Sequence, residues 1–288
     1  MRYAIITNPV SGKMTVHRKR AALAQAASIL NAEIFGLDTA SRDELSRCAR
    51  ELAARFEVLV AAGGDGTFSD IINAIDTTRT PVAFLPLGSG NAIGHALTYR
   101  GSLTDIAIRI RKGKIHECDL INCGHKKRAY LVSIGIDGTI ISLRERYLRQ
   151  GLTGFSAYAL AVLRSYFREY KRTVAKINID ERSFKVKNVL SIMVVKQPYY
   201  GYGMKMVPRA RFNDRRLHVL CINTGLLKCF LSAASAFTIG NRIGNYQSGQ
   251  HVTIGLERVL MMQADGNAIR RSGTFAFSVL PRAMKIKC

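Results

Sequence analysis

The segment that most constrains this chain is an apolar run that stops at two glycines. Val58 to Ala62 contains no polar side chain, and Gly63-Gly64-Asp65-Gly66-Thr67 follows directly. A short run that is apolar at every position is typical of a strand buried on both faces of a sheet. Glycines end such a strand and permit a tight turn. The segment therefore predicts a central strand with a glycine-rich loop at its carboxyl end.

Strands alternate with helices on both sides of this run. The predicted elements are, in chain order, a strand at 2–7, a helix at 16–30, a strand at 32–37, a helix at 41–55, the strand at 58–62, a helix at 67–76 and a strand at 82–85. Ser41 and Glu44 have the spacing of a helix capping box. Alternation of this kind predicts an α/β domain with a parallel sheet covered on both faces.

The pattern changes after about residue 115. Short strand-like runs separated by polar or glycine turns recur at 115–122, 129–135, 174–180, 184–195, 216–223, 252–256, 258–264 and 274–280. Such runs predict an antiparallel β-sandwich, interrupted by a helical stretch at 141–170. We therefore predict two domains, residues 1–115 and 116–288, and leave open whether the last residues return to the first domain.

Glycine-containing loops follow strands of the first domain at three places. They are Asn8-Pro9-Val10-Ser11-Gly12, Gly63 to Thr67, and Gly88-Ser89-Gly90-Asn91. The carboxyl ends of parallel strands line one edge of an open sheet, where ligands bind. Main-chain N–H groups at the following helix starts attract phosphate. The loops therefore predict a phosphate-binding edge, although no GxxxxGK[ST] motif is present.

In their order along the chain, these segments resemble the diacylglycerol kinase catalytic-domain family, which includes bacterial lipid kinases, sphingosine kinases and ceramide kinases. Asn8-Pro9-x-Ser11-Gly12, GGDGT at 63–67 and Pro86-x-Gly88-Ser89-Gly90-Asn91 are similar to its first three motifs. Gly201-x-Gly203-Met204, Asp214-x-x-Leu217 and Asp265-Gly266 continue the similarity through the second domain.

The resemblance implies an NAD kinase/diacylglycerol kinase-like fold and an ATP-dependent lipid kinase. Mg²⁺ accompanies the nucleotide, with Asp65 helping to place it, and Asp265 is the implied catalytic base. The second domain would hold the lipid, either a diacylglycerol or a sphingoid- or ceramide-like alcohol. The nucleotide contacts that the resemblance implies are Asn8, Pro9, Ser11, Gly12, Thr39, Gly63, Gly64, Asp65, Gly66, Thr67, Phe68, Ser69, Gly88, Ser89, Gly90 and Asn91.

Two positions depart from the family pattern. Asn267 stands where the family has glutamate, and an amide cannot accept the proton of an attacking hydroxyl. General-base help is worth about 10²–10⁴-fold, so either Asp265 takes over this role or the protein binds nucleotide and lipid without efficient transfer. Asp214 falls where bacterial members bind a structural Mg²⁺, but Arg215 beside it competes for the carboxylate.

The charge balance predicts an anionic partner. Lys and Arg number 43 against 20 Asp and Glu, a formal net charge of +23. Residues 143–172 mix basic with aromatic and aliphatic side chains, which suits an anionic membrane surface or an ordinary packed helix. Nucleic acid is disfavoured because no known binding motif accompanies the charge. Without a signal peptide pattern, and with scattered cysteines, we expect a cytoplasmic, peripherally membrane-associated protein and leave a homodimer open.

Overall fold

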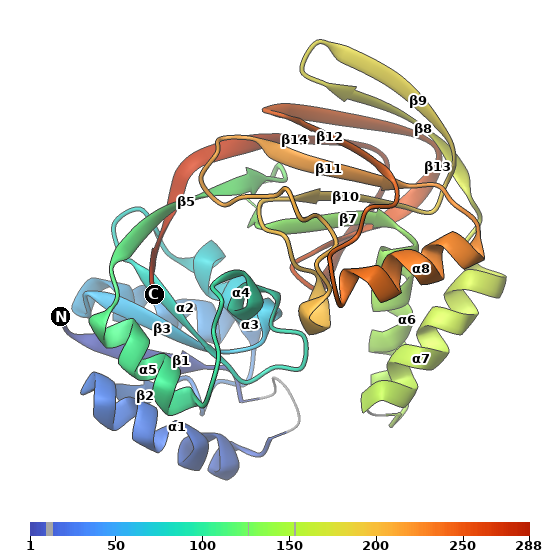
Figure 1. Ribbon diagram of the computed structural model, residues 1–288. Coiled ribbons are helices and arrows are strands. Elements are labelled where there is room, and N and C mark those ends of the chain that lie inside the picture. Colours follow the sequence, from blue (N-terminus) through green and yellow to red (C-terminus); the bar gives the residue numbers. More distant parts are fainter. Residues whose placement is uncertain (10–13, 126, 153) are drawn as a thin grey trace. The chain divides into compact units, whose positions relative to one another are not determined.

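The computed structural model describes residues 1–9, 14–125, 127–152 and 154–288 (Figure 1). The chain forms two compact units. The first contains Met1–Leu120, Tyr199–Met204 and Leu280–Cys288. The second contains Ile121–Pro198 and Lys205–Val279. The last residues of the chain and one internal segment therefore belong with the N-terminal residues.

The first unit is built on the predicted parallel sheet. Its strands follow the order β2-β1-β3-β4, and all neighbours are parallel. The end of the long strand β14 adds to β4 in parallel, with Ile286 opposite Val82. The bounds are β1 Tyr3–Thr7, β2 Glu33–Phe35, β3 Val58–Gly63, β4 Val82–Pro86 and β14 Asn267–Lys287. Every residue of β3 is buried, which confirms the buried strand predicted from its apolar run.

Helices between these strands supply the first unit's core. Their bounds are α1 Val16–Leu30, α2 Arg42–Arg55, α3 Asp65–Ala74, α4 Ala92–Ala96 and α5 Leu103–Lys112. Leu23 and Leu30 of α1 lie with Ile106 and Ile110 of α5 in the cluster that includes the sheet side chains. Ser41 caps α2 by accepting the Glu44 N–H, while the Glu44 carboxylate accepts the Ala40 N–H rather than that of Ser41.

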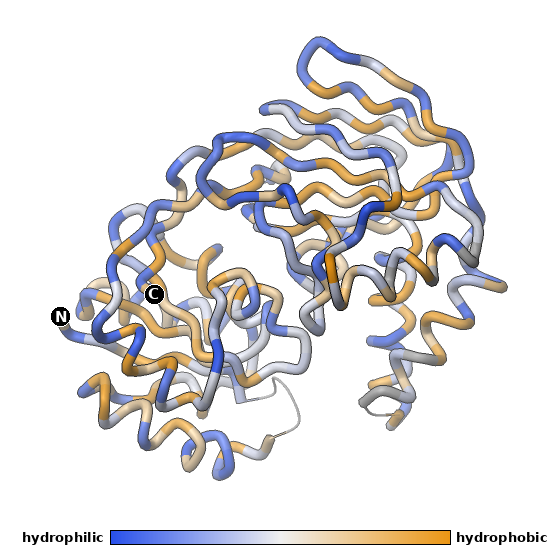
Figure 2. Tube along the Cα trace, in the orientation of Figure 1, coloured by the Kyte–Doolittle hydropathy of each residue, from blue (hydrophilic) through white to orange (hydrophobic). Residues whose placement is uncertain are grey.

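The second unit is the predicted antiparallel sandwich-type domain. Its strands follow the order β12-β11-β10-β7-β13-β14, with β8 on β13 and β9 on β8. Figure 2 shows hydrophobic stretches along these strands. The bounds are β5 Ile115–Asn122, β6 Arg128–Ala129, β7 Leu131–Gly135, β8 Thr173–Ile179, β9 Arg182–Val189, β10 Ser191–Val195, β11 Leu217–Ile222, β12 Asn245–Gly249 and β13 His251–Ala264.

Helical segments complete the second unit and part of the first. In the second unit they are α6 Ile136–Arg149, α7 Gly154–Arg164, the π-helical turn η1 Ser165–Glu169 and α8 Leu226–Ala236. The 3₁₀ turn η2, Gly201–Gly203, belongs to the first unit. Among the described residues, none of the helices combines the length and the apolarity that a bilayer crossing requires.

The sequence predictions and the structure differ at several boundaries. The run predicted at 184–195 is two strands that meet at Leu190, whose carbonyl accepts the Ile136 N–H. The runs at 252–256 and 258–264 are one strand, β13, in which the register shifts between Gly255 and Leu260. Helices α4 and α8 and strand β12 were not predicted, because α4 and β12 have only 5 residues each and α8 is apolar over most of its length. Helix α5 was missed although Ser102 and Asp105 form a capping box and Ile106, Ala107 and Ile110 lie on one buried face.

Candidate functional site

The ends of β3 and β4 are joined backbone to backbone. Gly63 lies opposite Pro86, and its carbonyl accepts the N–H groups of Leu87 and Gly88 at 2.8 and 3.2 Å. A Cβ added to Gly88 would lie 2.6 Å from the Gly64 Cα, closer than real side chains approach a backbone. Glycine at 88 is therefore required for the two loops to form one continuous edge.

Gly64 has no comparable internal reason to be glycine. A Cβ there would meet only the Gly88 Cα at 3.4 Å, which is ordinary van der Waals contact. Gly64 is the N-cap of α3 and offers no side-chain cap for its first N–H groups. Such N–H groups attract anions. Steric crowding thus explains why residue 88 is glycine. At residue 64 the protein itself imposes no such constraint, and glycine there would allow a ligand oxygen to approach the backbone closely.

The GGDGT segment is locked by its own side chains. A Cβ on Gly63 would lie 2.7 Å from the Thr67 Cβ and Oγ1. Thr67 is buried and Gly66 is half-buried in the first turn of α3. The Asp65 carboxylate accepts the N–H groups of Ala92 and Ile93 at 3.0 and 3.2 Å, at the start of α4.

This contact of Asp65 was not predicted. The sequence suggested that Asp65 orients Mg²⁺ on the nucleotide. In the structure its carboxylate also caps α4, because it accepts N–H groups at the helix start that have no partner within the helix. Asp65 therefore connects the second glycine loop to the third. Its placement makes it a positioning residue for the Gly88–Asn91 loop.

Asn91 closes the third loop on itself. It adopts a left-handed conformation with φ of 44°, which asparagine tolerates better than most residues. Its amide donates to the Gly88 carbonyl at 2.6 Å and accepts the Gly88 N–H at 3.2 Å. The Asn91 side chain thus closes the loop, and the nucleotide contact expected at Asn91 stays a prediction. Ser89, in contrast, is exposed.

A segment from the middle of the second unit's sequence docks on this loop. The Tyr202 N–H donates to the Gly90 carbonyl at 2.9 Å. Gly203 has a φ of 77°, and a Cβ there would lie 3.0 Å from the His95 ring of α4. The rings of Tyr199 and His95 lie 5.8 Å apart. The Gly201-x-Gly203 match therefore serves the glycine-loop edge itself, which the sequence did not reveal.

Phe68 and Ser69 turn inward from α3. Phe68 has no exposed surface and packs edge to face on Phe84, with ring centroids 5.5 Å apart. Its N–H donates to the Gly64 carbonyl, as helix geometry demands. Ser69 is also fully buried, and its carbonyl accepts the Asn73 amide. The helical period thus places the Phe68 side chain in the core, and the nucleotide contact expected at Phe68 stays a prediction.

The first loop is held by a buried lysine. The Lys19 Nζ donates to the carbonyls of Asn8 and Pro9 at 2.6 and 2.7 Å, and the side chain has no exposed surface. Burial lowers the pKa of Lys19. Sequence reasoning missed this residue, although it continues the buried α1 face of Leu23 and Leu30 by helical spacing. Ser11 and Gly12 of the same motif lie outside the described residues.

Thr39 reaches the same edge by way of β2. Its hydroxyl donates to the Gly36 carbonyl at 2.8 Å. Gly36 has a φ of 81°, and a Cβ there would lie 2.6 Å from the Thr7 carbonyl at the end of β1. The turn at Gly36–Thr39 therefore sits against the end of β1. Within the first unit, the sheet edge thus gathers the ends of β1, β2, β3 and β4, as parallel topology predicts.

Asp265 occupies a tight turn between β13 and β14 in the second unit. It has a φ of 49° and is 2% exposed. Its Oδ1 accepts the N–H groups of Tyr130 and Leu131 at 3.1 and 2.9 Å, and its own N–H donates to the Leu131 carbonyl. Gly266 donates to the Gln263 side chain, which in turn donates to Ser133. This turn holds the carboxylate in one orientation, and the neighbouring Asn267 is 8% exposed.

The residues around Asp214 do not fit a metal ion. The Lys196 Nζ lies 2.7 Å from Asp214 Oδ1, and the His218 Nε2 lies 2.8 Å from Oδ2. The Lys196 side chain is fully buried and also donates to the Arg216 carbonyl. In the described part of the chain, no cluster of three or more His, Cys, Asp or Glu side chains has metal-binding geometry. An internal ammonium thus pairs with Asp214, which disfavours the structural Mg²⁺ expected there.

The fold and this glycine-rich edge define a class of protein: a parallel α/β unit followed by an antiparallel sandwich, as in NAD kinase- and diacylglycerol kinase-like enzymes. Residues 2–123 match the diacylglycerol kinase catalytic domain, and residues 130–288 match the YegS C-terminal NAD kinase beta sandwich-like domain. The chain therefore belongs to the diacylglycerol kinase catalytic-domain family. Membership makes it an enzyme of the kinase class, a phosphotransferase.

Individual relatives agree with this membership. The chain is 26% identical to a diacylglycerol kinase of Staphylococcus saprophyticus over 74% of this chain and 70% of that protein. It is 23% identical to a Bacillus subtilis diacylglycerol kinase over 92% of this chain and 89% of that protein. A crystal structure of a Bacillus anthracis diacylglycerol kinase superposes with a TM-score of 0.72 at 14% identity, covering 99% and 96%. The crystal structure of an Archaeoglobus fulgidus NAD kinase in complex with ATP superposes with a TM-score of 0.52 at 13% identity, covering 100% of this chain and 94% of that chain.

Proposed function

We propose that this protein transfers the γ-phosphoryl group of Mg-ATP to a hydroxyl of a membrane lipid, either a diacylglycerol or a sphingoid- or ceramide-like alcohol. One observation carries the proposal. The loops after β3 and β4 are fused through Gly63, Gly64 and Gly88 into a single main-chain edge at the start of α3. Phosphoryl transfer needs positioning and charge neutralisation more than covalent help, and main-chain N–H groups supply both.

In this proposal each loop has a separate task. The N–H groups at the start of α3 hold phosphate oxygens, with the Ser89 hydroxyl as an additional donor. Asp65 and Asn91 keep the third loop in place, and Lys19 does so for the first. Thr39 and the Asn8–Gly12 segment stay proposed nucleotide contacts. Mg²⁺ enters with the nucleotide as part of the substrate.

The chemical step requires a proton acceptor. The lipid hydroxyl oxygen attacks the γ-phosphorus, the bond to the ADP oxygen breaks, and the hydroxyl proton goes to a base. Asp265 is the proposed base, because Asn267 cannot accept a proton. The two N–H groups on its Oδ1 fix the carboxylate, which keeps it from rotating during the transfer.

A second candidate function is favoured by Asn267 alone. If its amide has removed the catalytic base, the chain binds nucleotide and lipid without appreciable transfer. The two candidates share the glycine-loop edge and differ only in turnover.

Incubation of the purified protein with [γ-³²P]ATP, Mg²⁺ and a total lipid extract tests the proposal. We expect a labelled lipid, whose identification gives the acceptor alcohol. Calorimetry with Mg-ATP accompanies the assay. Binding without a labelled lipid would select the second candidate, and no binding at all would overturn both.

A further inference from the structure

Tyr202 has a backbone conformation that its side chain does not favour. It lies at φ 61° and ψ 23°, in the left-handed region, between Gly201 and Gly203. A bulky residue there is a genuine outlier, because its Cβ crowds the following carbonyl oxygen, whereas glycine adopts the same conformation without strain. The chain thus places a tyrosine where glycine would suit the turn better.

Burial does not explain the tyrosine ring. Tyr202 is 47% exposed, so about half of its surface stays outside the core. Its hydrogen bond to the Gly90 carbonyl comes from the main-chain N–H, which any residue except proline supplies. Strained residues of this kind gather at ligand-binding sites, where the surrounding structure holds them in place. The ring is therefore a candidate ligand contact.

Tyr202 lies at the glycine-loop edge of the first unit. A Cβ added to Gly90 of the third loop would lie 3.4 Å from the Gly201 Cα and 3.3 Å from Asp65 Oδ2. Asp65 is the first residue of α3, whose N–H groups are the proposed phosphate donors. Gly90 thus lies between the turn that carries Tyr202 and the start of α3.

The strand order favours the phosphoryl acceptor as the ligand part beside Tyr202. The strands follow the order β2-β1-β3-β4, so Thr39 and Asn8 lie toward one end of the edge, and Tyr202, docked on the loop after β4, toward the other. Thr39 and Asn8 are proposed nucleotide contacts. In phosphoryl transfer the attacking and leaving oxygens are in line, so the acceptor approaches the γ-phosphorus from the side opposite to ADP.

We propose that the Tyr202 ring packs on the hydrocarbon stem beside the attacking hydroxyl of the lipid acceptor. A phenol ring offers apolar faces to such a stem, and a half-exposed ring gains free energy when a ligand covers it. Tyr202 is then a specificity residue for the acceptor. The inference rests on the proposed function, because it requires a lipid alcohol as the acceptor.

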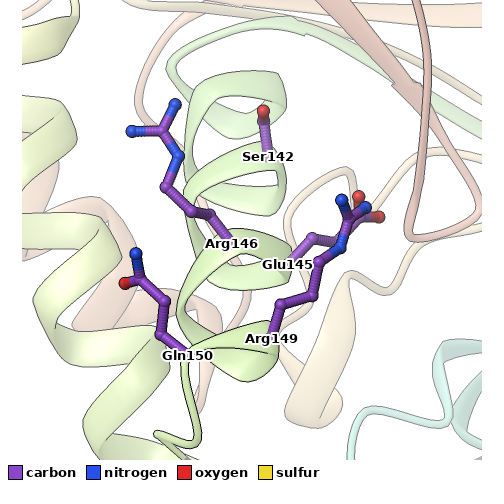
Figure 3. A pocket seen from close by; sticks show the side chains of 5 residues that line it. All are labelled: Ser142, Glu145, Arg146, Arg149 and Gln150. Atoms are coloured by element: carbon purple, nitrogen blue, oxygen red, sulfur yellow. The ribbon is translucent and has the colours of Figure 1, made fainter.

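The surface hollow on α6 does not suit a hydrocarbon stem. It has a volume of about 400 Å³ and is lined by Ser142, Glu145, Arg146, Arg149 and Gln150, which are all polar or charged (Figure 3). An apolar chain would cover these groups without forming hydrogen bonds to them, which costs free energy. This hollow therefore supplies a control position in the second unit.

Steady-state kinetics distinguish an acceptor contact from a purely structural role. The substrates are Mg-ATP and one of two acceptor probes, dihexanoylglycerol or sphingosine, whichever wild type phosphorylates faster. Tyr202→Ala should raise the KM of the acceptor about tenfold, because it removes the apolar ring from the contact. It should leave the KM of Mg-ATP unchanged. Tyr202→Phe keeps the ring and should retain the acceptor KM of wild type.

Thermal unfolding supplies a second measurement. Y202G removes the ring and the strain together, so its melting temperature should rise by about 2–4 °C while its acceptor KM rises as in Y202A. The control R282G relieves left-handed strain at Arg282, where φ is 51°, and should raise the melting temperature without changing either KM. The control Q150A, at the α6 hollow, should leave both KM values unchanged.

Three results would overturn the inference. The first is an unchanged acceptor KM in Y202A, and the second is an equal rise in the KM values of acceptor and Mg-ATP. The third is a Y202G protein that melts below wild type, since the ring would then serve the fold.

Failure of this inference is distinguishable from failure of the proposed function. Calorimetry measures binding of both probes in the presence of Mg-ADP, where no transfer is needed. If wild type binds a probe but transfers nothing, tenfold weaker binding by Y202A supports the inference while the kinase proposal fails. An active wild type with an unchanged Y202A refutes the inference alone. A wild type that neither transfers phosphate to the probes nor binds them would refute both.

Discussion

The Lys196 ammonium and the Asp214 carboxylate lie 2.7 Å apart, and the lysine side chain is wholly buried. Burial raises the pKa of Asp214, but the hydrogen bond from Lys196 and the other polar contacts lower it by more, so the carboxyl stays ionised. The Asp214 side chain is 24% exposed, and by pairing with it the buried Lys196 ammonium avoids the cost of isolated burial. The Lys196 ammonium thus supplies a positive charge beside Asp214, the position where the resemblance implied a structural Mg²⁺.

Lys196→Met should therefore destabilise the protein by about 3 kcal/mol, because it leaves the Asp214 carboxylate without its cation. EDTA should leave the melting temperature of the nucleotide-free wild type unchanged. Both are measured by thermal unfolding. The control K185M removes a lysine that is 63% exposed and pairs with Glu257 only at 3.8 Å, so its effect should stay below about 1 kcal/mol. If wild type binds one equivalent of Mn²⁺ and D214N binds none, Asp214 is a metal ligand and the interpretation that Lys196 takes the place of a metal ion is contradicted.

Acid should weaken the protein through His218. Burial lowers its pKa, and this outweighs the attraction of Asp214, which raises it. Between the folded-state value and the ordinary value of about 6.5, the unfolded chain binds the proton and the folded chain does not. Stability therefore falls as the pH drops below about 6.5 and stops falling below the folded-state pKa.

The variant His218→Gln isolates this contribution, because its amide can still donate to Asp214 but does not titrate. Wild type should lose more stability than H218Q between pH 7.5 and 5.5 in urea unfolding. Parallel losses in both proteins would show that other groups govern the acid response.

Gly64 and Gly88 should respond differently to alanine. In Gly88→Ala the new Cβ lies 2.6 Å from the Gly64 Cα, so the loops must separate, at a cost of about 1–3 kcal/mol. In Gly64→Ala the new Cβ makes only ordinary contact, so thermal unfolding should be unchanged within about 0.5 kcal/mol. Mg-ATP affinity in calorimetry should nevertheless fall about tenfold or more, because the methyl group obstructs a phosphate approaching the α3 start. If G64A binds Mg-ATP as tightly as wild type, the phosphates do not bind at this edge.

Asp265→Asn separates structure from catalysis at the β13–β14 turn. An amide oxygen can still accept the N–H groups of Tyr130 and Leu131, so the fold should persist, while the missing base should lower kcat about 10²–10⁴-fold. Asp265→Ala serves as the comparison, since it removes the acceptor as well and should lower the melting temperature. If D265N keeps wild-type kcat, Asp265 holds the turn and is not the base.

How much the sequence could predict depended on whether a residue's role was local. The burial of β3, the strand ends that carry glycine loops, and the Ser41 cap follow from short-range patterns. The hydrogen bonds of Asp65 to the N–H groups at 92 and 93 could not be predicted, because these partners are reached only when β3 and β4 pair. The burial of Phe68 against Phe84 follows from its helical phase, which the motif alone does not show. Lys196 and Asp214, 18 positions apart, meet only through the sheet.

The first unit is built from stretches that lie far apart in the sequence, and this limits where the chain can be cut into separate fragments. A fragment ending at Leu120 would lack Tyr199–Met204, whose Tyr202 N–H caps the Gly90 carbonyl, and the strand end that covers β4. It would also lose Lys287, which donates to the Gly113 carbonyl after α5. The unit is thus assembled from three separate stretches and is not an autonomous module. Gene fusion or truncation at the apparent boundary would yield a half with an open sheet edge and an unfinished third loop.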